Sequence, residues 1–454
     1  MNAEVERLVA LASELADRAL ARGVDVAEAR ARSGSELSVK VRLGEAELVE
    51  EAGHRSVGMR VMKGGRVALT STSDLTPTGL DRFVRDALEL LEVAQPDPFA
   101  GPAEPSLIAK GPFPDLQLFD ERCGEIDAAQ ALEMATRAEA AARSADVRIT
   151  NTDGAGFSRS AGCFGMALSG GFRGGYASSY ASLSVVAVAD DADHKKRRDS
   201  HWTARRFAAD LDTPESVGLE AARRTLKRLG ARKVPTQEAA IIFDPEAARS
   251  ILALFSGVIL GGSIWSKSSY LVGREGSRVA SDLVTIVDDP LIAKAPGSRP
   301  FDGEGLASRQ NLVVEDGILR TYLCDSYGAR KLERASTASA GRGAGGGVGT
   351  TTTNFVLRSG KSSASDIIKS TKQGLYVTDM MGHGFNPVTG DFSRGASGFW
   401  VENGELTFPV SEVTISLPLD DILQRIDAVG DDPDTRSSVI SPTLRISRMT
   451  IAGG

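Results

Sequence analysis

Histidine side chains are the first place to look for metal chemistry, and this chain of 454 residues has only four of them. They are His54, His194, His201 and His383, and none lies four residues from another, as the zinc-binding helix HExxH requires. The two nearest, His194 and His201, lie seven residues apart in a charged segment. A zinc site would therefore need side chains from distant segments to converge, and we predict no catalytic metal held by this chain alone.

The three cysteines, Cys123, Cys163 and Cys324, could supply a nucleophile. They are scattered, odd in number and form no CxxC pair, which indicates a reducing compartment without a disulfide framework. Cys163 and Cys324 lie in strand-like runs and are expected to be buried thiols. A hydrolase that uses Cys324 remains an alternative, although no local pattern activates it, and no GxSxG motif occurs.

The segment GRGAGGGVGT, residues 341–350, resembles a phosphate-binding loop. A phosphate loop needs a helix N-terminus after it, whereas here the strand-like TTTNFVL follows. We therefore predict a mobile loop whose backbone closely approaches another chain or a ligand, such as an extended peptide that pairs with a strand edge. The candidate cavity-lining residues are Gly345, Gly346, Thr351, Thr352 and Asn354.

The densest polar constellation is DMMGHGFNPVTGDFSRGASGFWVENGE, residues 379–405. Glycine-rich polar loops of this kind often carry binding residues, which makes Asp379, His383, Asp391 and Arg394 candidates for a cavity wall. The alternative is an ordered connection in which Asp391 and Arg394 satisfy each other and the backbone. The sequence leaves both interpretations open.

The run DPEAARSILALFSGVILGGSIW, residues 244–265, begins as an Asp-Pro helix start and has no ionisable side chain from Ser250 to Ser266. It is too short, and too rich in Gly and Ser, for a membrane span. We predict a core helix whose buried side chains are Ile251, Leu252, Leu254, Phe255, Val258 and Ile259.

The elements that must position these residues alternate between helical and strand patterns. SVGMRVMKGGRVALTST predicts a hairpin that turns at Gly64-Gly65, and Asp316-Gly317 and Asn403-Gly404 predict two more. A helix ending at Pro235 marks the expected boundary between two domains, residues 1–235 and 236–454. Mixed elements with sequential hairpins predict an α+β fold with largely antiparallel sheets and a strand-rich C-terminal half.

The composition excludes several classes of protein. Hydrophobic residues make up 41%, as in a soluble protein, and the net charge of −7 argues against nucleic acid as a main partner. The N-terminus MNAEVERLVALASELADRAL is an acidic amphipathic helix rather than a signal peptide, so a cytoplasmic protein is expected.

Four segments together resemble one family. MMGHGFNPVTGDFSRGASGFWVENGE, the hairpin above with the following SDLT, IIFDPEAARSILALFSGVILGG and DGEGLASRQNLVVEDGILRTYLCDSYGARKL are similar to the PmbA (TldE) branch of the TldD/PmbA family. The similarity runs in order through nearly the whole chain. An older family name, modulator of DNA gyrase, describes an indirect effect rather than a DNA-binding fold.

This resemblance implies a cytoplasmic metalloprotease of two homologous subunits that trims peptides or unfolded segments. The TldD branch carries zinc on a helix with HExxxH, in which Glu is the general base, and has a further Cys ligand near its C-terminus. Aligned on Pro245, the first His falls on Ala253, the Glu on Leu254 and the second His on Gly257. No Cys follows Cys324, so no metal role transfers to this chain and zinc is expected in the partner subunit.

Two functions follow from the resemblance. In the first, the chain is the non-catalytic partner of a TldD-type, zinc-bearing subunit and walls one side of a cavity that admits extended peptide. In the second, it acts alone as a homodimeric peptide-binding or chaperone-like module without hydrolysis. Neither involves nucleic acid or a membrane.

Overall fold

The computed structural model describes residues 1–453, and its first half is built on one long antiparallel sheet with the strand order β3-β2-β1-β4-β5-β6. The hairpin predicted at Gly64 and Gly65 is confirmed, since both residues have positive φ and link β2 to β3. The strands are β1 (Val26–Arg42), β2 (Glu45–Lys63), β3 (Arg66–Thr72), β4 (Ile149–Leu168), β5 (Arg173–Asp190) and β6 (Lys196–Arg205).

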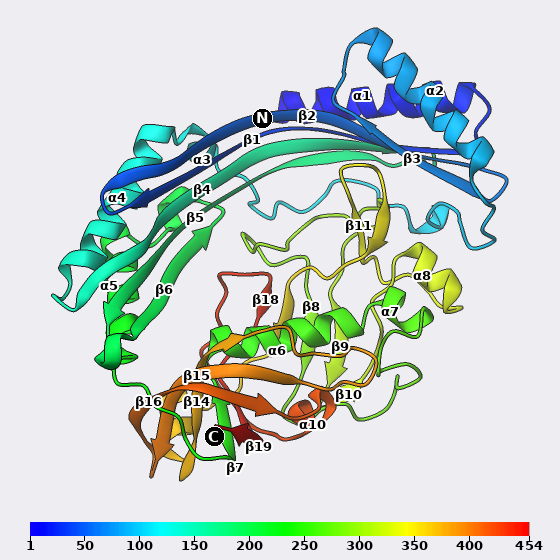
Figure 1. The fold of residues 1–454 in the computed structure, drawn as a ribbon. Helices are drawn as coiled ribbons and strands as arrows, with labels where there is room; N and C mark the ends of the chain where they lie inside the picture. Colours follow the sequence, from blue (N-terminus) through cyan, green and yellow to red (C-terminus); the bar gives the residue numbers. More distant parts are fainter. Residues whose placement is uncertain (454) are drawn as a thin grey trace.

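Helices cover only one face of this sheet. The odd-numbered side chains of β1 point to this face. Those from Ala27 to Ala31 pack under α1 and α2, and those from Leu37 to Val41 pack under α4 and α5. In the part of the chain that the structure describes, no helix layer covers the opposite face, on which Arg30 and Arg32 lie (Figure 1). The helices of this half are α1 (Asn2–Ala21), α2 (Pro77–Val93), α3 (Glu121–Glu125), α4 (Ala128–Ser144) and α5 (Pro214–Lys227).

The C-terminal half is strand-rich, as predicted, and contains two larger sheets. One has the order β16-β15-β14-β7-β19-β17, and a further pairing of β16 with β19 curls it towards a barrel. The other has the order β10-β9-β8-β13-β18. Among the paired strands of residues 1–453, only β7–β14 and β13–β18 are parallel, which confirms the α+β class with largely antiparallel sheets. The strands are β7 (Gln237–Phe243), β8 (Ile286–Asp288), β9 (Asn311–Glu315), β10 (Ile318–Leu319), β13 (Phe355–Leu357), β14 (Gln373–Met381), β15 (Ser393–Glu402), β16 (Glu405–Ser416), β17 (Ile426–Val429), β18 (Val439–Ile440) and β19 (Leu444–Ala452).

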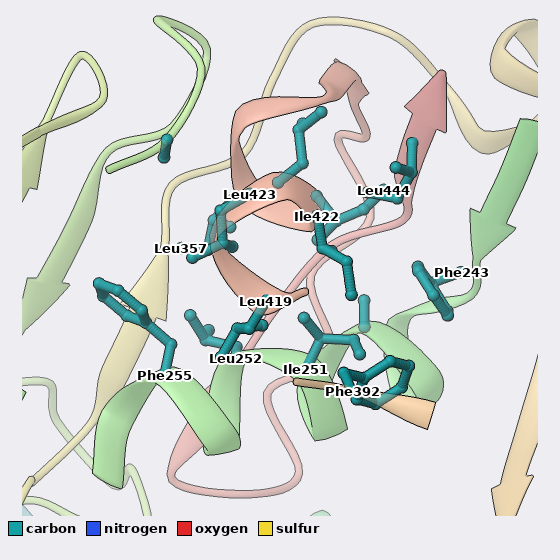
Figure 2. Packing of buried hydrophobic residues seen from close by; sticks show 14 of the residues in the cluster. Phe243, Ile251, Leu252, Phe255, Leu357, Phe392, Leu419, Ile422, Leu423 and Leu444 are labelled. Atoms are coloured by element: carbon teal, nitrogen blue, oxygen red, sulfur yellow. The ribbon is translucent and has the colours of Figure 1, made fainter. Parts of the chain in front are cut away.

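The apolar run 244–265 forms two helices rather than one. α6 (Pro245–Val258) ends before Leu260, and α7 (Gly261–Trp265) follows. Figure 2 shows Ile251, Leu252 and Phe255 of α6 among apolar side chains that include Leu419 and Leu423 of α10 (Leu419–Gln424). The predicted core positions are confirmed except Leu254, which is half-buried. The remaining short helices are α8 (Ser326–Lys331) and α9 (Ala364–Lys369).

The two halves face each other. Figure 1 shows the long sheet arching over the C-terminal half, with α6 on the side of that half that is turned to the sheet. A small hairpin of β11 (Ala340–Arg342) and β12 (Val348–Thr350) reaches from the C-terminal half towards the sheet. Within residues 1–453, no helix combines the length and the apolar character that a membrane crossing needs.

Candidate functional site

Helix α6 presents one face to the core and another to the space below the sheet. Asp244 caps its N-terminus, because the Asp244 carboxylate accepts a hydrogen bond from the Ala247 amide at 2.8 Å. On the other face, Ala253 and Gly257 are exposed and Leu254 is half-buried. A Cβ atom on Gly257 would meet nothing within 4 Å. At Ala253 and Gly257 the outer face of α6 is therefore accessible to a ligand.

The placement of the second zinc ligand needs a correction. In HExxxH the second histidine follows the first by five residues, so from Ala253 it falls on Val258 and not on Gly257. Val258 is buried in the core, whereas Gly257 is exposed. The chemical result is unchanged, since neither side chain has a lone pair for zinc.

The residues of this region do not fit a zinc ion. Alanine, leucine, glycine and valine offer no ligand atom, and no step through zinc can be assigned to this chain. In residues 1–453, the side chain of residue 193 apart, no group of three or more His, Cys, Asp or Glu is arranged to hold a metal.

Cys324 is not an activated nucleophile. The side chain is fully buried, and burial raises the pKa of the thiol to about 12. A thiol with this pKa stays protonated at neutral pH, whereas thiolate is the reactive form. The geometry argues against the Cys324 hydrolase, and the expectation of a buried thiol is confirmed.

The first turn of α6 joins the two halves of the molecule through Glu246. Its carboxylate accepts hydrogen bonds from Trp202 Nε1 of β6 at 2.7 Å and from Arg436 at 3.1 Å, and it pairs with Arg224 of α5 at 2.8 Å. Burial alone would raise the pKa of Glu246, but Arg224 and Arg436 lower it. No sequence pattern indicates this role, because Glu246 looks like an ordinary acidic residue of a first helical turn.

The glycine-rich segment is an interdomain contact rather than a mobile loop. It is the turn of the β11–β12 hairpin, and it lies directly on β2. A Cβ on Gly58 of β2 would lie 2.1 Å from the Ala344 carbonyl oxygen, and one on Gly346 would lie 2.8 Å from the Met59 backbone. Gly346 is buried and Gly345 half-buried, so the close approach predicted for these glycines is made to the chain's own N-terminal sheet.

A buried ion cluster reinforces this contact. Glu28 of β1 accepts hydrogen bonds from Arg60 of β2 at 2.7 Å and from Arg342 of β11 at 2.6 Å. Burial alone would raise the pKa of Glu28, but the two guanidinium groups lower it to about 2. The ionised carboxylate therefore links the sheet to the hairpin.

The three remaining candidates of this segment differ in exposure. Thr351 and Thr352 are half-buried. Asn354 is fully buried, and its amide group donates to the Asp289 carbonyl and to Ser298 while accepting from the Gly297 amide. Asn354 therefore braces the interior, and its side chain is not available to a ligand.

The polar loop between β14 and β15 places His383 and Asp391 at the surface. Asp391 accepts a hydrogen bond from Thr389 at 2.6 Å, and Arg394 stacks near the Phe392 ring at 5.7 Å. The Asp379 carboxylate lies 3.6 Å from the guanidinium group of Arg228, the residue that follows α5. Among the side chains described in residues 1–453, Asp391 and Arg394 form no ion pair within 4.0 Å, nor does any hydrogen bond join this loop to the glycine-rich hairpin. The structure does not gather the two candidate segments into one site.

Fold and sequence together define a class of protein. The chain matches three domains of one family along its length: PmbA/TldA metallopeptidase domain 1 over residues 27–91, the central domain over 121–229 and the C-terminal domain over 236–453. The chain belongs to the PmbA/TldD metallopeptidase family.

Relatives within the family are similar over almost the whole chain. Metalloprotease PmbA of Escherichia coli O157:H7 is 39% identical over 429 residues, which cover 94% of this chain and 92% of that protein. A Bacteroides thetaiotaomicron structure described as a modulator of DNA gyrase superposes with a TM-score of 0.91 at 27% identity, covering 98% of both chains. TldE from Thermococcus kodakarensis has a TM-score of 0.86 at 21% identity, covers 97% of this chain and 99% of its own, and shares the fold.

Proposed function

We propose that this chain is the non-catalytic partner subunit of a TldD/TldE-type heteromeric metalloprotease that processes peptides or unfolded segments. One observation carries the proposal. The positions of α6 to which the resemblance assigns a zinc motif bear Ala253, Leu254 and Val258, and none of these side chains can bind a metal or accept a proton. Zinc and the general base would come from a homologous TldD-type subunit in the same cytoplasmic complex.

The rigid placement of α6 supports a scaffolding role. Its first turn is fixed to both halves through Glu246, and its inner face is packed in the core. A helix that had merely lost its function would need no such attachment to the arching sheet. We infer that α6 helps to wall a cavity shared with the partner.

The test is reconstitution with a TldD-type subunit. The chain is purified alone and together with that subunit, and the cleavage of a fluorogenic peptide and the zinc content are measured. We expect chelator-sensitive cleavage, and about one zinc per heteromer, only when both subunits are present. Cleavage by the lone chain that a chelator abolishes would contradict the proposal.

The second candidate is a homodimeric peptide-binding module without hydrolysis. This function is supported by the helix-free face of the long sheet, where two hollows lined by arginines, serines and aromatic rings offer a surface to a peptide. This function predicts that the isolated chain binds unfolded peptide with the same affinity as the heteromer, and that addition of the TldD-type subunit produces no cleavage.

A further inference from the structure

A pocket of about 240 Å³ lies on the helix-free face of the sheet, where segments 299–303 and 341–342 pack against β1, β4 and β5. Its lining includes three arginines and three aromatic rings: Arg30, Arg299, Arg342, Phe164, Tyr176 and Phe301. No part of the proposed function uses these side chains.

Two of the arginines lack an acidic partner. Among the described side chains of residues 1–453, neither Arg30 nor Arg299 forms an ion pair within 4.0 Å, whereas Arg342 is paired with Glu28. Arg30 Nε, Arg299 Nε and Arg299 Nη2 are buried without a hydrogen-bond partner. Unmet charged donors in a desolvated position are unfavourable, so an anion that accepts from them would be stabilised.

The geometry of both guanidinium groups is fixed. Arg30 lies over the Phe164 ring, with its Cζ 4.1 Å from the centroid, and donates to the Arg342 carbonyl. Arg299 donates to the Ala340 carbonyl at 2.8 Å. Two planar donors held in this way suit a planar carboxylate, which accepts two parallel hydrogen bonds.

Asp302, the acidic side chain in the pocket lining, makes its hydrogen bonds away from the two unpaired arginines. Asp302 is already engaged by the backbone amides of Glu304, Leu306 and Ala340. Among the described side chains of residues 1–453, no hydrogen bond joins Asp302 to Arg30 or Arg299. The two guanidinium groups therefore keep donors that no carboxylate of the pocket lining accepts from.

The aromatic wall indicates what accompanies the carboxylate. Phe301 packs against Tyr176, with centroids 5.5 Å apart, and Phe164 packs edge-on against Tyr176 at 4.6 Å. A second hollow of about 170 Å³ shares Arg30 and Phe164 and continues along the sheet past Ser160 and Ser178. The first pocket thus has room for about one residue, and the second continues it in the direction of the strands.

We propose that the pocket between Arg30, Arg299 and the rings of Phe164, Tyr176 and Phe301 binds the C-terminal carboxylate and last side chain of an extended peptide. This inference deepens the proposed function and rests on it for the choice of a peptide as ligand. It assigns to this subunit the recognition of a free peptide end, while the bond cleavage occurs in the partner.

The test measures the binding of one peptide in two forms to the full-length chain alone. A pentapeptide ending in leucine, labelled at its N-terminus, is prepared with a free C-terminal acid or as the amide, and binding is followed by fluorescence anisotropy. We expect the acid to bind about tenfold or more tightly, since the amide leaves a charged donor unmatched. Equal affinities for acid and amide would overturn the proposal, and this comparison needs no variant.

Variants then locate the site. Arg30→Gln should remove the preference for the acid, and Arg30→Lys should restore part of it, because the charge returns without the planar fork. Arg148→Gln is the matched control, since Arg148 is exposed and pairs with Asp146 away from the pocket. If thermal unfolding shows that Arg30→Gln is not folded, Arg299→Gln replaces it. A folded variant that keeps the full acid preference contradicts the assignment.

Competition separates the two sources of an oxyanion. We expect N-acetyl-leucine to displace the peptide, and inorganic phosphate at the same concentration to leave it bound. Displacement by phosphate alone would overturn the proposal. The result is independent of reconstitution. If the heteromer cleaves peptide but the chain binds acid and amide equally, the proposed function is supported and the role of this pocket is contradicted. If the chain prefers the acid but the heteromer does not cleave, the pocket is supported and the proposed function is contradicted.

Discussion

At the scale of single residues, Gly58 is the position where the sheet and the glycine-rich hairpin come closest. An alanine there would place its Cβ 2.1 Å from the Ala344 carbonyl oxygen and 2.8 Å from the Gly346 amide nitrogen, and all of these are backbone atoms. The hairpin must then shift away from β2. We expect Gly58→Ala to lower the free energy of unfolding by about 1–3 kcal/mol, as measured by chemical denaturation.

The control for this prediction lies on the same strand. A Cβ on Gly53 would have its nearest neighbour, the Gly34 carbonyl oxygen, at 4.0 Å. Gly53→Ala should therefore leave stability unchanged or raise it slightly, because alanine restricts the unfolded chain. Equal effects of the two substitutions would show that the hairpin does not dock on β2 in solution.

Asp244 gives a second residue-scale prediction, in its pH dependence. Burial raises the pKa of this carboxyl to about 7 from its ordinary value of 3.8. Between these values the folded state binds more protons than the unfolded state, so this group makes stability fall as the pH rises from about 4 to about 7. The slope for one proton is at most about 1.4 kcal/mol per pH unit.

Asp244→Asn should remove that slope and keep the helix cap, because asparagine is also a favourable N-cap residue. Denaturation of both proteins at several pH values measures the difference. We expect the variant to gain stability relative to the wild type as the pH rises towards 7. A constant difference across this range would show that Asp244 is ionised throughout in the folded protein.

At the scale of elements, α6 contains a glycine that no contact requires. Gly257 lies in the last turn of the helix with open space around it, and glycine in a helix is less stable than alanine by about 0.5–1 kcal/mol. Gly257→Ala should therefore stabilise the chain by that amount. Gly261 is the contrasting position, since its Cβ would lie 2.7 Å from Cys324 Sγ, and Gly261→Ala should destabilise it.

Thermal unfolding of the two variants measures these stability changes, which we expect to have opposite signs. Loss of stability in Gly257→Ala would mean that the outer face of α6 is covered in the isolated protein. If Gly257→Ala is more stable but lowers the cleavage rate of the reconstituted heteromer, the open face of α6 serves the shared cavity.

The elements show how far sequence reasoning reaches. Local patterns were sufficient for the hairpin at Gly64-Gly65 and for most of the buried face of α6, because turn geometry and helical periodicity are properties of neighbouring residues. The same reasoning failed for the glycine-rich segment, which it predicted as a mobile loop. This segment needs glycine because its backbone lies against the backbone of Gly58 and Met59, nearly 300 residues earlier in the chain. No local sequence pattern encodes that contact.

The candidate site shows the same limit. The sequence marked Asn354 as polar and near a loop, but its burial depends on Asp289, Ser298 and Gly297, which only the folded chain brings together. It also passed over Arg30 and Arg299, since isolated arginines on strands are common. No signal in the sequence distinguishes an arginine without an acidic partner from one that has a partner across the fold.

At the scale of the whole molecule, the junction of sheet and hairpin depends on the buried carboxylate of Glu28. Removing its charge takes from Arg342 its ion-pair partner and leaves Arg60 only Glu304, at 3.9 Å, and the loss of one member of a buried pair commonly costs about 3–5 kcal/mol. We expect Glu28→Gln to lower the free energy of unfolding by about 3 kcal/mol and to speed proteolytic cleavage within residues 343–347. Glu47→Gln, which removes an exposed partner of Lys40, should leave stability nearly unchanged, because solvent screens this pair.

The pH dependence of wild type and variant provides the independent check. The pKa of Glu28 is lowered to about 2 from its ordinary 4.5, so the stability that it contributes is fully present above about pH 4.5 and is lost as the pH falls towards 2. The stability difference between wild type and Glu28→Gln should therefore shrink through this acidic window and stay constant near neutrality. A difference that persists unchanged at the acidic end would mean that the substitution acts through packing, and that the two halves are held together without the ionised carboxylate.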